Sequence, residues 1–235
     1  MKNRTKAWFY PILIISVLLV LENRCKKDDN NNGNPPVTGT VTDIDGNTYR
    51  TIKIGTQVWM AENLKTTKYR DGDTIPQVKD GGAWSVDTTG AYCNWNNDIN
   101  VVPEYGRLYN WYACTNPHKL APEGWHIPSV SEWGVLIVFL GGDSIAGGSM
   151  KDTDTTHWAS LNIGATNSSG FTAIAASARA SNGPFFGPNL FAAFWTSLSS
   201  NNYLAYKYYI INNSAYIYKE DEYKQQGHNV RCIKD

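Results

Sequence analysis

The clearest helical pattern in the chain lies between residues 106 and 142. Four apolar residues there fall at i, i+3, i+4 and i+7, the spacing of one helix face: Trp133, Leu136, Ile137 and Leu140. Ser129, followed three positions later by Glu132, has the sequence of a capping box, and Gly141-Gly142 supplies a left-handed stop. A shorter helical pattern around Trp111 precedes it, across a loop rich in Pro and Gly. This stretch therefore predicts two short helices.

Residues 39–64 instead alternate apolar and polar side chains, which is the pattern of half-buried strands. Asp45-Gly46 is a hairpin signal, and residues 54–57 carry a second turn sequence. The pattern predicts an antiparallel meander at the start of the domain.

Two further strand regions lie toward the C-terminus. Residues 203–218 are rich in aromatic and β-branched side chains, with Asn212-Asn213 as the turn between two strands. Residues 227–235 predict a closing strand that carries Val230 and Cys232 on one of its faces.

The segments between these elements are predicted to be loops. Residues 65–105 and residues 143–180 show no long helical pattern. Asp71-Gly72-Asp73 resembles the start of a calcium-binding loop, but the remaining ligand positions and the distal Glu of an EF-hand are missing. We therefore favour a simple turn, because Asp and Gly are common turn residues.

Composition narrows the class of protein. The chain has 235 residues, of which 42% are hydrophobic and 18% charged, so one large domain with a packed core is feasible. The formal net charge is zero, which argues against a nucleic-acid partner. Nine Trp and fourteen Tyr are a heavy aromatic load, so many Tyr must lie near the surface.

The N-terminus has the features of a targeting segment. Basic residues 2, 4 and 6 precede an apolar run at residues 11–21, which is too short to span a bilayer comfortably. We predict a signal peptide over residues 1–24; the alternative is an N-terminal membrane anchor that is never cleaved.

Cys25 follows the apolar run directly and precedes a polar tail, an arrangement that resembles a bacterial lipoprotein. The resemblance implies lipidation of Cys25, a flexible linker over residues 25–38, and membrane contact through the lipid anchor only. Glu22-Asn23-Arg24 departs from the small residues that usually precede such a cysteine. The charged run at residues 26–29 resembles export signals of Bacteroidetes lipoproteins, which implies an outer-membrane protein that is surface-exposed.

Several blocks over residues 39–235 match a known family: GRLYNWYA, LAPEGWHIPSVSEW, GATNSSGFTA, FWTS and the terminal VRCIKD. They resemble the Fibrobacter succinogenes major paralogous domain, which is similar to the C-type-lectin-like superfamily. The resemblance implies an α+β fold in which two short helices pack on small antiparallel sheets with long ordered loops. It also implies pairing of the first and last strands, which would bring Val41 close to Val230.

The same resemblance implies a disulfide between Cys93 and Cys232, because both positions recur in the family. The rival pairing joins Cys114 to Cys232, as in true C-type lectins. The sequence alone does not fix the connectivity.

Catalytic motifs of the common hydrolase, metalloprotease and redox types do not occur in the sequence, and its four histidines are scattered. We therefore predict no catalytic residues, no metal ligands, no cofactor and no enzymatic activity. The alternative is an envelope enzyme related to formylglycine-generating enzymes. Those enzymes need a pair of reactive cysteines near the C-terminus, where only Cys232 lies.

The remaining candidate chemistry is the Tyr- and Asn-rich region after residue 200. Tyr and Asn make adaptable contact surfaces, and the family resemblance places the ligand face in this region. We predict that these residues bind a glycan or a surface protein: Asn201, Asn202, Tyr203, Tyr206, Tyr208, Tyr216 and Tyr218. The alternatives are that these tyrosines cover the core, and that the protein is purely structural.

Overall fold

The computed structural model of the chain describes residues 37–235. The predicted signal peptide at residues 1–24 and the predicted lipidation of Cys25 lie outside the described residues. The predicted domain, residues 39–235, lies entirely inside them.

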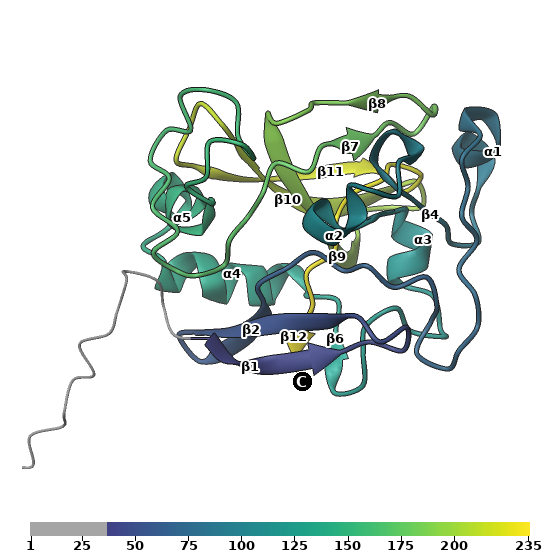
Figure 1. The fold of residues 1–235 in the computed structure, drawn as a ribbon, viewed down its shortest axis with the longest axis horizontal. Helices are drawn as coiled ribbons and strands as arrows, with labels where there is room; N and C mark the ends of the chain where they lie inside the picture. The colour runs from purple at the N-terminus through teal and green to yellow at the C-terminus, as the bar shows by residue number, and fades with distance from the viewer. Residues whose placement is uncertain (1–36) are drawn as a thin grey trace, which may run out of the picture. The chain divides into compact units, whose positions relative to one another are not determined.

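The first three strands belong to a five-stranded sheet of order β1-β2-β3-β12-β6 (Figure 1). Its members are β1 (Val37–Thr42), β2 (Thr48–Ile54), β3 (Gln57–Met60), β6 (Trp125–His126) and β12 (Ile233–Lys234). The predicted hairpins are confirmed: the backbone N–H of Gly46 donates to the Asp43 carbonyl over 3.0 Å, and Ile54 pairs with Gln57 across the second turn. Gly46 and Gly55 have φ of 85° and 61°, which a glycine adopts without strain.

The closing strand pairs differently from the expectation. β12 has two residues, and its Ile233 lies opposite Trp59 of β3 and His126 of β6. The first strand pairs with β2 instead, so the predicted pairing of first and last strands is wrong. Val41 nevertheless packs, partly buried, against the hydrophobic cluster that contains Val230.

A second sheet has the order β11-β10-β9. It consists of β9 (Phe191–Ser199), β10 (Leu204–Ile211) and β11 (Ile217–Tyr223). The predicted turn at Asn212-Asn213 is confirmed, since it follows the end of β10. Two small ladders complete the sheets: β4 (Tyr92–Cys93) with β5 (Leu108–Tyr109), and β7 (Ala178–Arg179) with β8 (Phe185–Phe186).

The described residues contain five short α-helices rather than the two expected: α1 (Gly81–Val86), α2 (Val102–Tyr105), α3 (Trp111–Cys114), α4 (Val130–Phe139) and α5 (Asp143–Met150). A 3₁₀ turn covers Trp95–Asn97. The two predicted helices are α3 and α4, and the capping box of α4 is confirmed in both directions: the backbone N–H of Ser129 donates to the Glu132 carboxylate, and that of Glu132 donates to the Ser129 hydroxyl.

The helix α5 was missed because its sequence, DSIAGGSM, is poor in helix formers. Its glycines serve close packing instead. A Cβ on Gly147 would lie 2.4 Å from the carbonyl oxygen of Tyr216, and one on Gly148 would lie 2.3 Å from that of Gly164. Tertiary contacts therefore stabilise this helix, and the local sequence does not show them.

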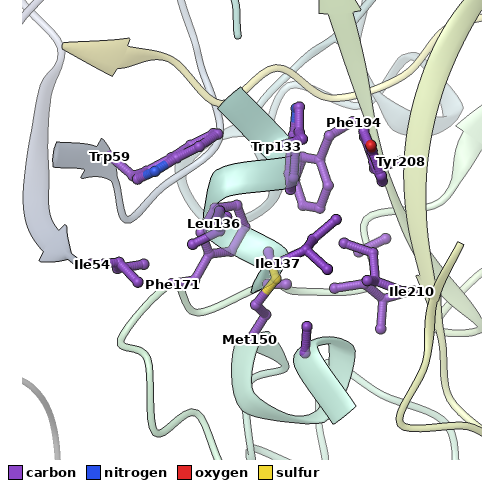
Figure 2. Close-up of a cluster of buried hydrophobic side chains, with 14 of the residues drawn as sticks. Ile54, Trp59, Trp133, Leu136, Ile137, Met150, Phe171, Phe194, Tyr208 and Ile210 are labelled. Atoms are coloured by element: carbon purple, nitrogen blue, oxygen red, sulfur yellow. The ribbon is translucent and has the colours of Figure 1, made fainter. Parts of the chain in front are cut away.

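The main core lies around α4, between the two larger sheets (Figure 1). Figure 2 shows the inner face of α4 meeting side chains from both sheets, among them Ile54 and Trp59 from one and Phe194 and Ile210 from the other. Two further buried clusters lie around Trp195 and Trp84. Because residues 41–233 supply all three clusters, the domain carries its own hydrophobic cores and is expected to fold by itself.

No single helix within residues 37–235 is long and apolar enough to cross a membrane. The helices α4 and α5 are long and apolar enough only when taken together, and the pair is bent by 87°.

An ion-pair cluster links α2 to the segment after α5. The His157 ring contacts the Asp152 carboxylate at Nδ1 and lies 2.6 Å from the Glu104 carboxylate at Nε2. Burial opposes protonation, but the hydrogen bonds to Glu104 and Asp152 together raise the pKa of His157 above its usual value.

This cluster predicts a pH dependence of stability. A raised folded pKa gives stabilisation that is fully present below the unfolded pKa of about 6.5 and is lost as the pH rises through the folded value. We expect wild type to lose more thermal stability than His157→Gln between about pH 5.5 and about pH 8.5. Thermal melts of the two proteins at both pH values measure this difference. Equal losses would contradict a stabilising contribution from protonated His157.

Candidate functional site

The seven residues predicted to bind a ligand fall into separate environments. The structure brings Asn201, Asn202 and Tyr203 together, and they line a cavity of about 470 Å³ with Leu204 and Tyr223. We call this cavity the tyrosine pocket. Tyr203 and Tyr223 are 74% and 54% exposed, so both rings are open to a ligand.

Local hydrogen bonds fix the shape of the tyrosine pocket. It lies where β9 turns into β10, and the Asn201 side-chain oxygen accepts from the backbone N–H groups of Tyr203 at 2.8 Å and Leu204 at 2.9 Å. Antiparallel pairing places Tyr223 opposite Leu204. Lys224 then ties the end of β11 to the turn, because its ammonium group donates to the Asn202 carbonyl over 3.1 Å.

Leu204 and Tyr223 are not among the seven predicted ligand residues, although Tyr223 belongs to the same tyrosine-rich region. Both become part of the pocket through the register between β10 and β11. The signal that could have found Tyr223 is the hairpin itself: counting outward from the predicted turn at Asn212-Asn213 brings the far ends of the two strands together.

Tyr216 and Tyr218 belong to another surface. Their rings stack at 5.9 Å between centroids, and Tyr218 also stacks on Tyr209 at 5.1 Å. Tyr206 lies elsewhere on β10, half-buried beneath the Lys219 ammonium group, which is 5.1 Å from its ring centroid. These three predicted residues therefore do not line the tyrosine pocket.

Tyr208 is a core residue, so its prediction as a ligand residue is wrong. Its side chain is buried, and its ring stacks on Trp133 with centroids 5.1 Å apart (Figure 2). Burial raises its pKa. The reason is that α4 covers this part of β10 and buries the ring against its inner face.

The expected disulfide is also absent. Among the described residues Cys93, Cys114 and Cys232 are free, buried thiols. Cys93 packs with Trp84 in one cluster, whereas Cys114 and Cys232 share another cluster. Burial raises the pKa of Cys93 to about 12 and raises those of Cys114 and Cys232 as well, so none of these thiols is poised as a nucleophile.

A second cavity, of about 420 Å³, opens near the C-terminus and is lined in part by Arg70, His126 and Asp235. The charged groups of these three residues are committed to structural contacts. Arg70 donates to the carbonyls of Ala121 and Trp125 over 2.9 and 2.6 Å. The His126 ring bridges two carboxylates: it lies 2.6 Å from that of Asp235 and 2.7 Å from that of Glu132, in the first turn of α4.

The turn at Asp71-Gly72-Asp73 is confirmed, since the Gly72 N–H donates to the Tyr69 carbonyl over 3.0 Å. The structure adds His118 from a distant loop. Ligand atoms of Asp71, Asp73 and His118 all lie within 4.8 Å of one another, which makes them the one three-residue group in residues 37–235 with metal-ligand spacing.

Hydrogen bonding between Asp71 and the His118 ring raises the pKa of His118 and lowers that of Asp71. The three side chains are exposed and satisfy one another as an ion pair. A metal would have to displace the imidazole proton, and the imidazole would favour a transition metal over calcium.

The described residues thus define a small α+β domain with a cavity lined by Tyr and Asn at one strand turn. Comparison with known protein families matches residues 52–234 to the Fibrobacter succinogenes major domain. The chain belongs to this family, as its sequence blocks indicated. No curated protein and no solved structure matches it.

Proposed function

We propose that this protein is a cell-envelope lipoprotein whose single domain binds a glycan or a surface protein at the tyrosine pocket, without catalysis. The observation that carries the binding proposal is the pocket itself. Two exposed tyrosine rings flank side-chain amides in a cavity of about 470 Å³. Aromatic rings supply apolar contact and amides supply hydrogen bonds, the combination that recognises a sugar or a polar protein loop.

The lipoprotein part of the proposal rests on the sequence. Cys25 follows an apolar run and precedes a polar linker that reaches the domain. On this proposal Cys25 is the lipidated first residue of the mature chain, which is held at the outer membrane with the domain outside. We also propose a C-type-lectin-like arrangement, supported by the helices between an early sheet and a late sheet.

Mass spectrometry of the full chain expressed in a Gram-negative host tests the lipoprotein proposal. The expected result is a chain that begins at Cys25 and carries acyl groups, together with a Cys25→Ser variant that is not acylated. An unmodified chain, or one that keeps residues 1–24, would overturn this part.

A binding screen against polysaccharides and envelope proteins, run with calcium and with chelator, tests the binding proposal. Binding that survives the chelator supports recognition by the tyrosine pocket alone. Binding that needs calcium would instead direct attention to Asp71, Asp73 and His118. No binding in either condition would overturn the proposal in favour of a structural role.

The runner-up is an envelope enzyme related to formylglycine-generating enzymes. Such chemistry needs a reactive thiol, and Cys232 offers a buried thiol whose pKa is raised by burial. This geometry gives the enzymatic alternative no support, so binding is the function we propose.

A further inference from the structure

An apolar groove runs between α4 and the β2–β3 hairpin, away from the tyrosine pocket residues. Its volume is about 1000 Å³, and its lining includes Ile54, Gly55, Val135, Val138 and Phe139. Val135, Val138 and Phe139 are 50%, 77% and 61% exposed. Three large apolar side chains within five helical positions therefore face solvent.

These exposed residues are not needed for the core. The inner face of α4 already packs through Trp133, Leu136 and Ile137, which are buried. A helix that packs on a core by one face ordinarily carries polar residues on the other. The outer face of α4 is apolar instead, and a contiguous exposed apolar surface of this kind marks an interaction site.

The groove lies where the chain enters the domain. Thr38 lines it, one residue after the first described residue. Cys25 precedes Thr38 by 13 residues, and a chain of that length spans at most roughly 45 Å. The one charged residue in the lining is Lys53, so the apolar surface carries a positive charge beside it and no negative one.

We propose that this groove is the surface by which the domain docks on the lipid bilayer that holds its N-terminus. Val135, Val138 and Phe139 insert among the lipid headgroups and upper acyl chains, and Lys53 meets anionic lipid phosphates. The short tether raises the effective concentration of bilayer at the groove to the order of millimolar, so a weak apolar contact suffices. This inference rests on the membrane attachment in the proposed function, and it gives the domain a fixed orientation on the membrane.

A fluorescence experiment on residues 37–235 tests the docking. An N-terminal histidine tag tethers the domain to vesicles of phosphatidylcholine and phosphatidylglycerol that contain a nickel-chelating lipid. An environment-sensitive dye is attached at Val138→Cys or, as the control, at Val86→Cys on α1. The two positions are matched, with 77% and 75% exposure, and the three native thiols of the domain are buried and escape labelling.

The expected result is a severalfold rise and blue shift of emission at position 138 on tethering, and no change at position 86. Adding Val135→Asp should remove most of that rise while the thermal melt stays unchanged, because Val135 is half-exposed. Equal responses at positions 138 and 86 would overturn the proposal. So would a rise at position 138 without vesicles at high protein concentration, which would mean that a second copy fills the groove.

The tag replaces the natural anchor, so this experiment does not depend on lipidation of Cys25 or on ligand binding at the tyrosine pocket. A domain that docks while Cys25 proves unmodified would refute the lipoprotein proposal alone. A lipidated chain whose domain fails to dock would refute this inference alone.

Discussion

Replacing Trp133 with alanine is expected to lower the free energy of unfolding by about 3–5 kcal/mol, the usual cost of removing a buried aromatic side chain. Trp133 is fully buried at the centre of the α4 core. Its ring centroid lies 5.0 Å from Trp59, 5.8 Å from Phe171 and 5.7 Å from Phe194. Alanine would leave a cavity among these rings and would remove a large part of the contact between α4 and the two sheets. Urea unfolding followed by tryptophan fluorescence or circular dichroism measures the loss.

Trp133→Phe is the matched control. The indole N–H of Trp133 is buried, and within residues 37–235 it has no hydrogen-bond partner. Phenylalanine keeps most of the aromatic contact and removes this unpaired donor, so it should cost clearly less than alanine. Similar unfolding curves for Trp133→Ala and wild type would show that the core does not depend on the Trp133 side chain.

Replacing Arg231 with methionine is expected to destabilise the domain by about 3–5 kcal/mol. The Arg231 guanidinium is buried and donates to the side-chain oxygen of Asn63 over 2.7 Å and to the Thr172 carbonyl over 2.8 Å. It also donates to the carbonyls of Phe171 and Met60. Methionine fills similar space but donates to none of them, so several buried acceptors would lose their partner.

Arg231→Lys separates hydrogen bonding from packing. The lysine ammonium group has three donors but lacks the planar fork, so it should restore only part of the lost stability. The expected order of urea midpoints is wild type, then lysine, then methionine. If methionine were as stable as wild type, the acceptors around Arg231 would have to be satisfied in another way.

Features set by local sequence were predictable from the chain alone. The capping box at Ser129 and the hairpin at Asp45-Gly46 need only a few neighbouring residues, because their hydrogen bonds close within one turn. Family membership was likewise readable from short blocks, and residues 52–234 confirm it.

Features set by distant contacts were not predictable. Lys151 is buried and its ammonium group donates to the carbonyls of Ile163, Ile211 and Ser214 over 2.7, 3.1 and 2.9 Å. A Lys usually lies at the surface, so no local pattern assigns it this role. Arg231 is the same case on the last segment.

The predicted ligand face shows what amino-acid composition can predict and what it cannot. The Tyr- and Asn-rich composition found the stretch that contains Asn201, Asn202 and Tyr203, and these three do line one cavity. Composition could not tell Tyr203, which is exposed, from Tyr208, which α4 covers. That distinction depends on which part of β10 the helix buries, and strand alternation alone does not contain it.

The most direct test of ligand binding at the tyrosine pocket compares three proteins on one polysaccharide and envelope-protein array: wild type, the Tyr203→Ala/Tyr223→Ala double variant, and Tyr216→Ala. Tyr216 is 49% exposed and lies outside the tyrosine pocket, so it controls for general loss of surface tyrosine. Wild type and Tyr216→Ala are expected to bind the same ligand, and the double variant is expected to bind it at least about tenfold more weakly. Equal binding by all three proteins would contradict this expectation.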